Sequence, residues 1–177
     1  MDRFSANFEV RLKHFGIQPD LLKTDKVTIN KKTGWDDQGA PFPIKVHRTK
    51  SLDEVKRLIG NPDKQFEKET DRTSETHSEF AKLKDVSKHQ IGAVASAYVF
   101  GNSKPLAHLA AHLENAIGEV VIHVAAANEL VVDQVIEVSG KDPKVITVDR
   151  LIFTKNGQII STGMLTINAG TIVNQSK

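Results

Sequence analysis

The chain has 177 residues, with 24 Lys and Arg against 22 Asp and Glu, 39% hydrophobic residues and no cysteine. This length predicts one domain, or one domain with a sizeable extension, and it suffices for a hydrophobic core. The absence of cysteine excludes disulfide scaffolds, thiolate zinc sites and cysteine nucleophiles. The net charge of +2 is too small to indicate a nucleic-acid binder, because such domains concentrate Lys and Arg on one face.

Charged residues are unevenly distributed along the chain. They occupy 29 of the first 80 positions but only 17 of the last 97. The difference predicts a charge-rich helical and irregular extension over residues 1–78 and a compact domain over residues 79–177. We expect no transmembrane helix, since no window holds 18 apolar residues, and the N-terminus lacks the apolar core of a secretory signal.

The first 78 residues contain two helix patterns. Phe4, Phe8, Leu12 and Phe15 fall on one helical stripe, which predicts a short amphipathic helix ending at Gly16. Residues 24–47 are rich in turn formers and predict irregular structure with a short strand at Lys26–Ile29. The segment from Ser51 to Gly60 predicts a second helix with Ser51 and Glu54 as a capping box. Residues 61–78 are expected to form a linker or a solvated loop.

Residues 79–118 predict two helices. Apolar residues recur at helical spacing from Phe80 to Val99, in a stretch rich in Ala and Ser. A second helix follows Gly101, with Ser103 as its candidate N-cap and Gly118 as its end.

After Gly118 the hydrophobic period changes from 3.6 to 2 and β-branched residues dominate. Short strands are expected at Val120–Val124, Leu130–Val132, Val135–Val138, Val145–Val148, Leu151–Phe153, Gln158–Ile160, Leu165–Ile167 and Thr171–Val173. Three similar runs begin at Val121, Val145 and Met164, which are 24 and then 19 residues apart. A second apolar run follows each of them. A unit of about 20 residues with two or three short strands is typical of stacked-coil β-folds.

On these runs, residues 120–173 resemble the right-handed parallel β-helix of the pectin-lyase-like and adhesin-passenger type. The resemblance implies an α+β protein in which helices, with His108–Ile117 as the cap, close one end of a short β-helix. An antiparallel meander or sandwich with helices on one face is the alternative, because Asn156-Gly157 between two apolar runs is a strong hairpin signal. Both folds stay open at this stage.

Few residues indicate chemistry. His108 and His112 lie four apart on one helix face, as zinc-binding pairs do, but no third ligand is placed by spacing, so helix histidines without a metal are the simpler interpretation. Asp133, Asp149 and Arg150 are the charged residues placed to form a carbohydrate site on a β-helix face. Trp35 beside Asp36-Asp37 is a candidate for stacking on a sugar or anchoring a partner. No cofactor is indicated.

The end of the predicted β-helix is the main functional signal. About two and a half coils are too few for a stable repeat fold, so the last strand is expected to associate with another copy or with a continuing chain. The association edge comprises Leu165, Ile167, Ile172 and Val173. The sequence thus favours a non-catalytic binding or assembly protein, and the resemblance implies a surface, secreted or virulence-related one. A carbohydrate-active enzyme and a pore-forming or toxin-delivery component, with Ile91–Ala97 as its membrane-seeking helix, are the alternatives.

Overall fold

The computed structural model describes residues 4–22, 25–29, 44–66 and 79–175. By their contacts, the residues group into two compact units, Met1–His47 with Val121–Lys177, and Arg48–Val120. The first unit therefore contains both ends of the chain, and the second is inserted between them in sequence. The division at residues 78 and 79 that charge density suggests is a division of composition and stays a prediction.

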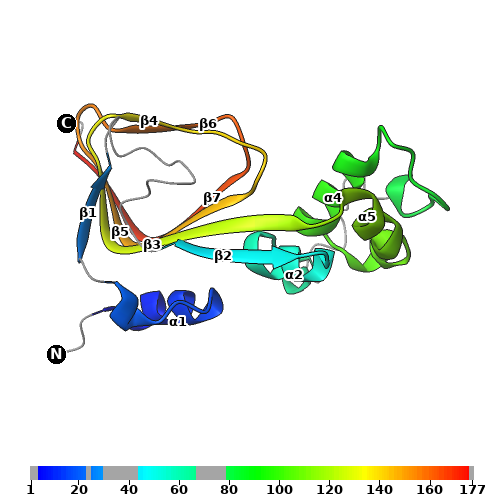
Figure 1. Ribbon diagram of the computed structural model, residues 1–177, viewed down its shortest axis with the longest axis horizontal. Helices are drawn as coiled ribbons and strands as arrows, with labels where there is room; N and C mark the ends of the chain where they lie inside the picture. The colour runs from blue at the N-terminus through cyan, green and yellow to red at the C-terminus, as the bar shows by residue number, and fades with distance from the viewer. Residues whose placement is uncertain (1–3, 23–24, 30–43, 67–78, 176–177) are drawn as a thin grey trace. The chain divides into compact units, whose positions relative to one another are not determined.

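The first unit contains two β-sheets whose registered pairings are all parallel. The larger sheet holds β1 (Lys26–Ile29), β3 (Val120–Val132), β5 (Lys144–Phe153) and β7 (Leu165–Asn174) in that order, and β2 (Ile44–Thr49) also pairs with β3. The smaller sheet holds β4 (Val135–Val138) and β6 (Gln158–Ser161). From β3 to β7 the chain alternates between the two sheets (Figure 1). The protein is thus an α+β chain with parallel sheets, as expected.

Successive strands of the larger sheet align at a constant spacing of 21 residues. Val124 lies opposite Val145, and Val145 lies opposite Thr166. The runs that begin at Val121 and Met164 are therefore not at positions equivalent to Val145, although the register agrees with the expected unit of about 20 residues. Sequence similarity alone matches runs of β-branched residues without regard to their strand register.

The three long strands each merge two of the predicted short ones, and the sheet bends between the merged parts (Figure 1). Ala127 and Leu130 both belong to the hydrophobic core although they are three residues apart. Asn128 and Glu129 between them are outside this core, which interrupts the alternation of inward and outward side chains. The same interruption recurs one register step later at Asp149–Arg150 and two steps later at Gly170–Thr171.

The Asn156-Gly157 turn does not form the predicted hairpin. It joins β5 to β6, which belong to different sheets. Gly157 does not have the positive φ that a type I′ turn requires. It is needed for another reason, since a Cβ at Gly157 would lie 1.9 Å from the carbonyl oxygen of Val132. The antiparallel alternative is therefore not what the registered strand pairs show.

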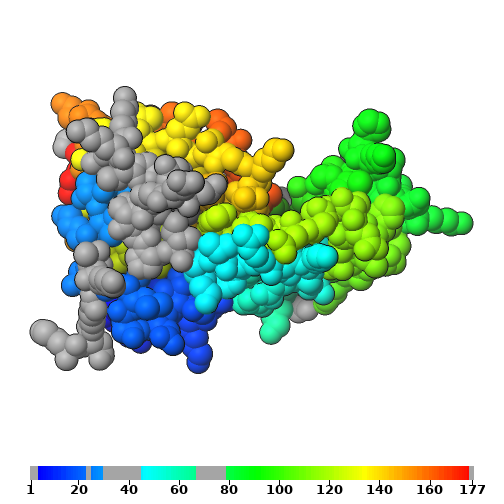
Figure 2. Space-filling model, viewed as in Figure 1, coloured from blue at the N-terminus to red at the C-terminus, as the bar shows by residue number. Residues whose placement is uncertain are grey.

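The core of this unit is arranged in rows that cross the larger sheet. One row contains Ala125 and Ile146, and another contains Leu130 and Leu151. Side chains of β4 and β6 complete the core from the smaller sheet, and the neighbouring yellow and orange surfaces in Figure 2 are these two parts of the chain. Rows of equivalent apolar side chains hold the successive strands in register.

Strands lie at the first edge of the larger sheet. β1 pairs with Glu129–Val132 of β3, and β2 also pairs with β3. The helix predicted as a cap, His108–Ile117, groups with the other unit. The short strand predicted at Lys26–Ile29 is confirmed as β1. The strand β2 begins in the segment 24–47 that is predicted to be irregular and continues beyond it, although Ile44, Val46 and the β-branched Thr49 are a weak strand signal.

Helix α1 (Ala6–His14) belongs to the same unit and packs against β5. Ser5 caps it by accepting a hydrogen bond from the Phe8 N–H, and Phe8 and Leu12 are fully buried, as the apolar stripe predicts. Arg11 of this helix donates a hydrogen bond to the carbonyl oxygen of Val148, at 2.9 Å. A short 3-10 helix, η1 (Pro19–Leu21), follows.

The second unit is helical. It contains α2 (Leu52–Ile59), η2 (Asp63–Gln65), α4 (Ile91–Phe100), η3 (Lys104–Leu109) and α5 (Ala110–Ile117). The predicted helix from Ser51 to Gly60 is confirmed as α2, with Ser51 accepting from the Glu54 N–H. Of the predicted linker, residues 61–66 include η2, and residues 67–78 lie outside the described residues.

The first of the two helices predicted over residues 79–118 begins later than expected. Residues 81–90 form turns, in which the Asp85 carboxylate accepts from the Val86 N–H and the Gln90 side chain accepts from the Ser87 N–H. Such side-chain bonds compete with the helix for backbone donors. Ser103 is the N-cap residue of η3, where the second helical segment begins, but its side chain makes no capping hydrogen bond because its hydroxyl donates to Asp63.

Candidate functional site

The four residues of the predicted association edge all lie on β7, the last strand of the larger sheet. β7 pairs with β5 on one side, and no described strand pairs with its other side. Within the core rows, exposure rises sharply at this strand. Ala125 and Ile146 are fully buried, whereas Ile167 in the same row is 37% exposed.

A second row ends in the same way. Leu130 and Leu151 are buried, whereas Ile172, next in that row, is 63% exposed. Ile167 and Ile172 are thus equivalent in register to core residues, and they are exposed because no further described strand covers them. Leu165 and Val173 on the same strand are half-buried.

The outer edge of β7 also lacks the usual protection of an edge strand. Natural sheets commonly place Lys, Pro or an inward-pointing charge on such strands, because unpaired N–H and C=O groups are templates for another strand. β7 is ten residues long and contains neither a charged residue nor a proline. This edge can therefore accept a β-strand without burying a charge.

The acidic and basic residues proposed for a carbohydrate site lie at the bend of the larger sheet and contact their own chain. Asp149 accepts a hydrogen bond of 2.6 Å from the Ser5 hydroxyl and lies 3.7 Å from Arg11, so it fastens α1 to β5. Arg150 forms an ion pair with Glu129, at 3.4 Å. Asp149 and Arg150, two candidates for a carbohydrate site, therefore contact structural partners of their own chain.

The remaining candidates for ligand binding are Asp133 and Trp35. Asp133 lies in the turn between β3 and β4, and its Oδ1 atom is buried without a hydrogen-bond partner among the described residues. Trp35 lies outside the described residues. The structure thus brings Asp149 and Arg150 to one bend of β5, whereas Asp133 lies in the turn after β3.

His108 and His112 both bind backbone of their own unit. The Nε2 atom of His108 lies 2.9 Å from the carbonyl oxygen of Leu83, and that of His112 lies 3.1 Å from the carbonyl oxygen of Val86. The Nδ1 atom of His112 is 3.4 Å from Asp85. No cluster of three or more potential metal ligands occurs among the residues that the structure describes. The pair fastens residues 83–86 to η3 and α5.

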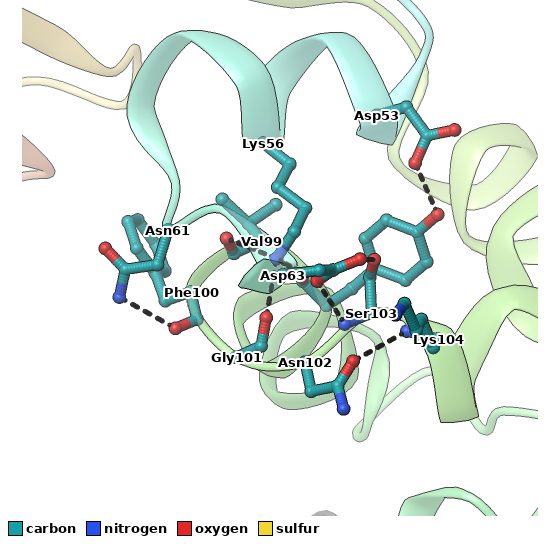
Figure 3. Close-up of polar contacts among 11 residues, drawn as sticks. Asp53, Lys56, Asn61, Asp63, Val99, Phe100, Gly101, Asn102, Ser103 and Lys104 are labelled. Atoms are coloured by element: carbon teal, nitrogen blue, oxygen red, sulfur yellow. Dashed lines mark hydrogen bonds and ion pairs between the residues drawn. The ribbon is translucent and has the colours of Figure 1, made fainter. Parts of the chain in front are cut away.

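The second unit contains a polar cluster that sequence reasoning missed (Figure 3). Lys56 of α2 is almost fully buried, and its Nζ atom donates to the carbonyl oxygens of Tyr98 at 3.0 Å and Gly101 at 2.5 Å. The same atom lies 3.1 Å from the Asp63 carboxylate. Because the carbonyl groups at a helix end carry partial negative charge, Lys56 stabilises the C-terminus of α4. In sequence, Lys56 is one of many lysines in a charged segment, so no signal distinguishes it.

Two acidic groups complete this cluster. Burial disfavours the charged form of Asp63, but hydrogen bonds from the N–H and hydroxyl groups of Ser103, together with Lys56, outweigh it and hold its pKa below the usual value. Burial and a hydrogen bond of 2.6 Å to Asp53 raise the pKa of the Tyr98 hydroxyl. The cluster is satisfied by its own members, which is the arrangement of a structural joint between α2 and α4.

The comparisons with known proteins cover families, curated proteins and solved structures. None of the three finds a match. The function must therefore be argued from the geometry alone. Within the described residues, no helix is both long enough and apolar enough to cross a membrane, and Val94, in the segment Ile91–Ala97 considered as a membrane-seeking helix, is fully buried.

Proposed function

We propose that this chain is a non-catalytic assembly protein whose copies associate through the outer edge of β7. The observation that supports the proposal is the sudden exposure of two core rows at the last strand, where Ile167 and Ile172 follow fully or almost fully buried residues. An uncharged ten-residue edge beside them supplies backbone donors and acceptors for a strand of another copy.

The energies favour association through this edge. The exposed fractions of Ile167 and Ile172, 37% and 63%, together equal one fully exposed isoleucine. Burying it contributes about 1.5–3 kcal/mol for each copy. Each backbone hydrogen bond that the edge gains adds about 0.5–1.5 kcal/mol. Several such bonds form at once along a ten-residue strand, and together with the side-chain contribution they oppose the entropy that two copies lose on association.

We further propose that the alternating strands are successive coils of a right-handed parallel β-helix. Three features support this assignment: the constant 21-residue register, the alternation between two parallel sheets, and backbone hydrogen bonds that continue through the turns, such as Thr154 N–H to Val132 and Thr162 N–H to Val138. The hand follows from the strong preference for right-handed crossovers between parallel strands. β7 is then the start of a coil whose end surface is available to a neighbour.

The test is the mass of the particle in solution. Light scattering coupled to gel filtration, from low to high micromolar protein, is expected to give a multiple of the 19.5 kDa chain mass. Ile172→Lys places a charge at the proposed contact and is expected to give a monomer. Since Ile172 is 63% exposed, this change leaves the fold intact, which circular dichroism checks.

A matched control separates the effect of changing β7 from the general effect of replacing an exposed isoleucine by lysine. Ile160 on β6 is 42% exposed, and its register partner Glu137 faces away from the core. Ile160→Lys is therefore expected to associate as the unmodified protein does. A monomeric unmodified protein at the highest concentration, or an Ile172→Lys variant with unchanged mass, contradicts the proposed function.

A further inference from the structure

We infer that two copies pair tail to tail, with β7 of one antiparallel to β7 of the other about a two-fold axis between Gly170 and Thr171. The inference rests on the proposed function and adds the partner, the direction and the register. In this register Ala169 faces Ile172 of the second copy, and Ile167 faces Asn174.

The inward-facing positions along β7 follow a pattern that reads similarly in both chain directions. Its register partners in β5 place Leu165, Ile167, Ala169, Ile172 and Asn174 in the core rows. The inward positions Ile167, Ala169, Ile172 and Asn174 are symmetric about the point between Gly170 and Thr171, because the interruption at the bend falls at this point. When β7 of a second copy pairs antiparallel in this register, inward side chains therefore lie opposite inward ones. Outward side chains lie opposite outward ones, as a sheet requires.

The bend restricts the register further. A bent edge matches a second bent edge only where the two bends coincide, and a two-fold axis at the bend gives this coincidence. Moving the register by two residues along the strand would set the bend of one copy against a straight part of the other. In the symmetric register, the small Ala169 lies opposite the large, 63% exposed Ile172, so the side chains can fill the contact without crowding.

The other edge of the same sheet also favours pairing between two β7 strands. A head-to-tail contact would need an open strand of matching length at the β3 side. That side is already occupied by β1, which has four residues and begins with a lysine, and by β2. The β7 edge therefore finds its best match in another β7 edge, and the contact closes as a dimer with no further copies added. β7 carries no charge, so two such strands do not repel each other.

Single cysteines provide the test, because the chain has none of its own. In the inferred register, position 168 of one copy lies opposite position 173 of the other, both facing outward. Directly opposite residues have Cα atoms about 4.5–5.5 Å apart, within the range that a disulfide spans. Asn168→Cys and Val173→Cys are mixed in equal amounts, oxidised mildly and mapped by mass spectrometry.

The expected product joins position 168 of one copy to position 173 of the other. Each variant oxidised alone is the control and is expected to stay largely unlinked, since identical positions are then five residues apart along the strand, about 16 Å. A second pair, Thr166→Cys with Gln175→Cys, occupies the next equivalent positions and repeats the test if the first pair perturbs association.

The outcomes separate this inference from the proposed function. If the protein associates and Ile172→Lys abolishes association, but the linked positions are 168 with 168, the strands run parallel and the inference is wrong while the proposed function stands. Association without the 168-to-173 link, from both cysteine pairs, also overturns the register. A protein that stays monomeric overturns both.

Discussion

At the scale of single residues, glycines mark the places where successive passes of the chain come closest. A Cβ at Gly157 would meet the carbonyl oxygen of Val132 at 1.9 Å, and one at Gly163 would meet that of Gly140 at 2.5 Å. Both contacts are with backbone more than 20 residues earlier in the chain, which cannot move aside like a side chain. The identity of these residues is therefore set by stacking and not by turn geometry.

Gly157→Ala is expected to destabilise the protein by about 2–4 kcal/mol, because the backbone around Val132 must shift and the hydrogen bonds nearby weaken. Gly92→Ala is the matched control. Gly92 lies inside α4, and a Cβ added there would meet nothing within 4 Å, so alanine is expected to stabilise by about 0.5–1 kcal/mol. Urea unfolding of both variants measures the difference, and equal effects would contradict the stacking argument.

Glycines also show what a sequence can reveal at this scale. Local turn chemistry predicts a hairpin at Asn156-Gly157, and the local rule fails because the governing contact is with Val132, distant in sequence. The prediction that Gly118 ends a helix is confirmed, with a positive φ at that residue, since this requirement is local. The edge residues of β7 can be found in the sequence because they belong to a local apolar run. Lys56 cannot be found in this way, because its role depends on a helix about 40 residues away.

At the scale of elements, Lys56 fastens α2 to the C-terminus of α4. Lys56→Met keeps the length of the side chain but removes the donor, so the carbonyl groups of Tyr98 and Gly101 lose a charged partner. A loss of about 2–4 kcal/mol is expected. Lys64→Met, at an exposed position in η2, is the control and is expected to stay within about 0.5 kcal/mol of the unmodified protein.

The same joint gives a pH dependence with a definite sign. The folded-state pKa of Asp63 lies below its usual value of 3.8, so its contribution to stability is present above that value and is lost as pH falls through it toward the lower folded pKa. Asp63→Asn is thus expected to lower the urea midpoint at pH 7, and the difference from the unmodified protein should shrink below pH about 4. A difference that is constant across this range would show that the charge of Asp63 does not matter.

A helix or strand can be predicted from the sequence where a single apolar stripe, or a single alternation of apolar and polar residues, determines it. The helices capped by Ser5 and Ser51 and the strand at Lys26–Ile29 agree with local patterns. The late start of α4 does not, because the side chains of Asp85 and Gln90 hold nearby N–H groups. The merging of short strands into long bent ones also escapes local patterns, since the bend shows only when three strands are aligned.

At the scale of the whole molecule, the chain consists of two compact units, one of which is inserted within the other in sequence. Each has its own buried residues. Val94 in α4 and Leu151 in β5 are both fully or almost fully buried. The two units are therefore expected to open separately when amide exchange is followed under native conditions.

A pair of cavity-forming substitutions tests this expectation. Val94→Ala is expected to cost about 1–3 kcal/mol and to accelerate exchange mainly in α2, α4 and α5. Leu151→Ala is expected to cost about 2–5 kcal/mol and to act mainly on β3, β5 and β7. Each variant serves as the control for the other. If either substitution accelerated exchange equally in both units, the chain would open as one cooperative body.

The constant register of the larger sheet coexists with turns of unequal length. Two residues separate β3 from β4 and four separate β5 from β6, whereas five separate β4 from β5 and three separate β6 from β7. A gain of two residues on one side is thus offset by a loss of two on the other. What the fold conserves is the total path between neighbouring strands, so residues can be exchanged between opposite turns while every core row stays in place.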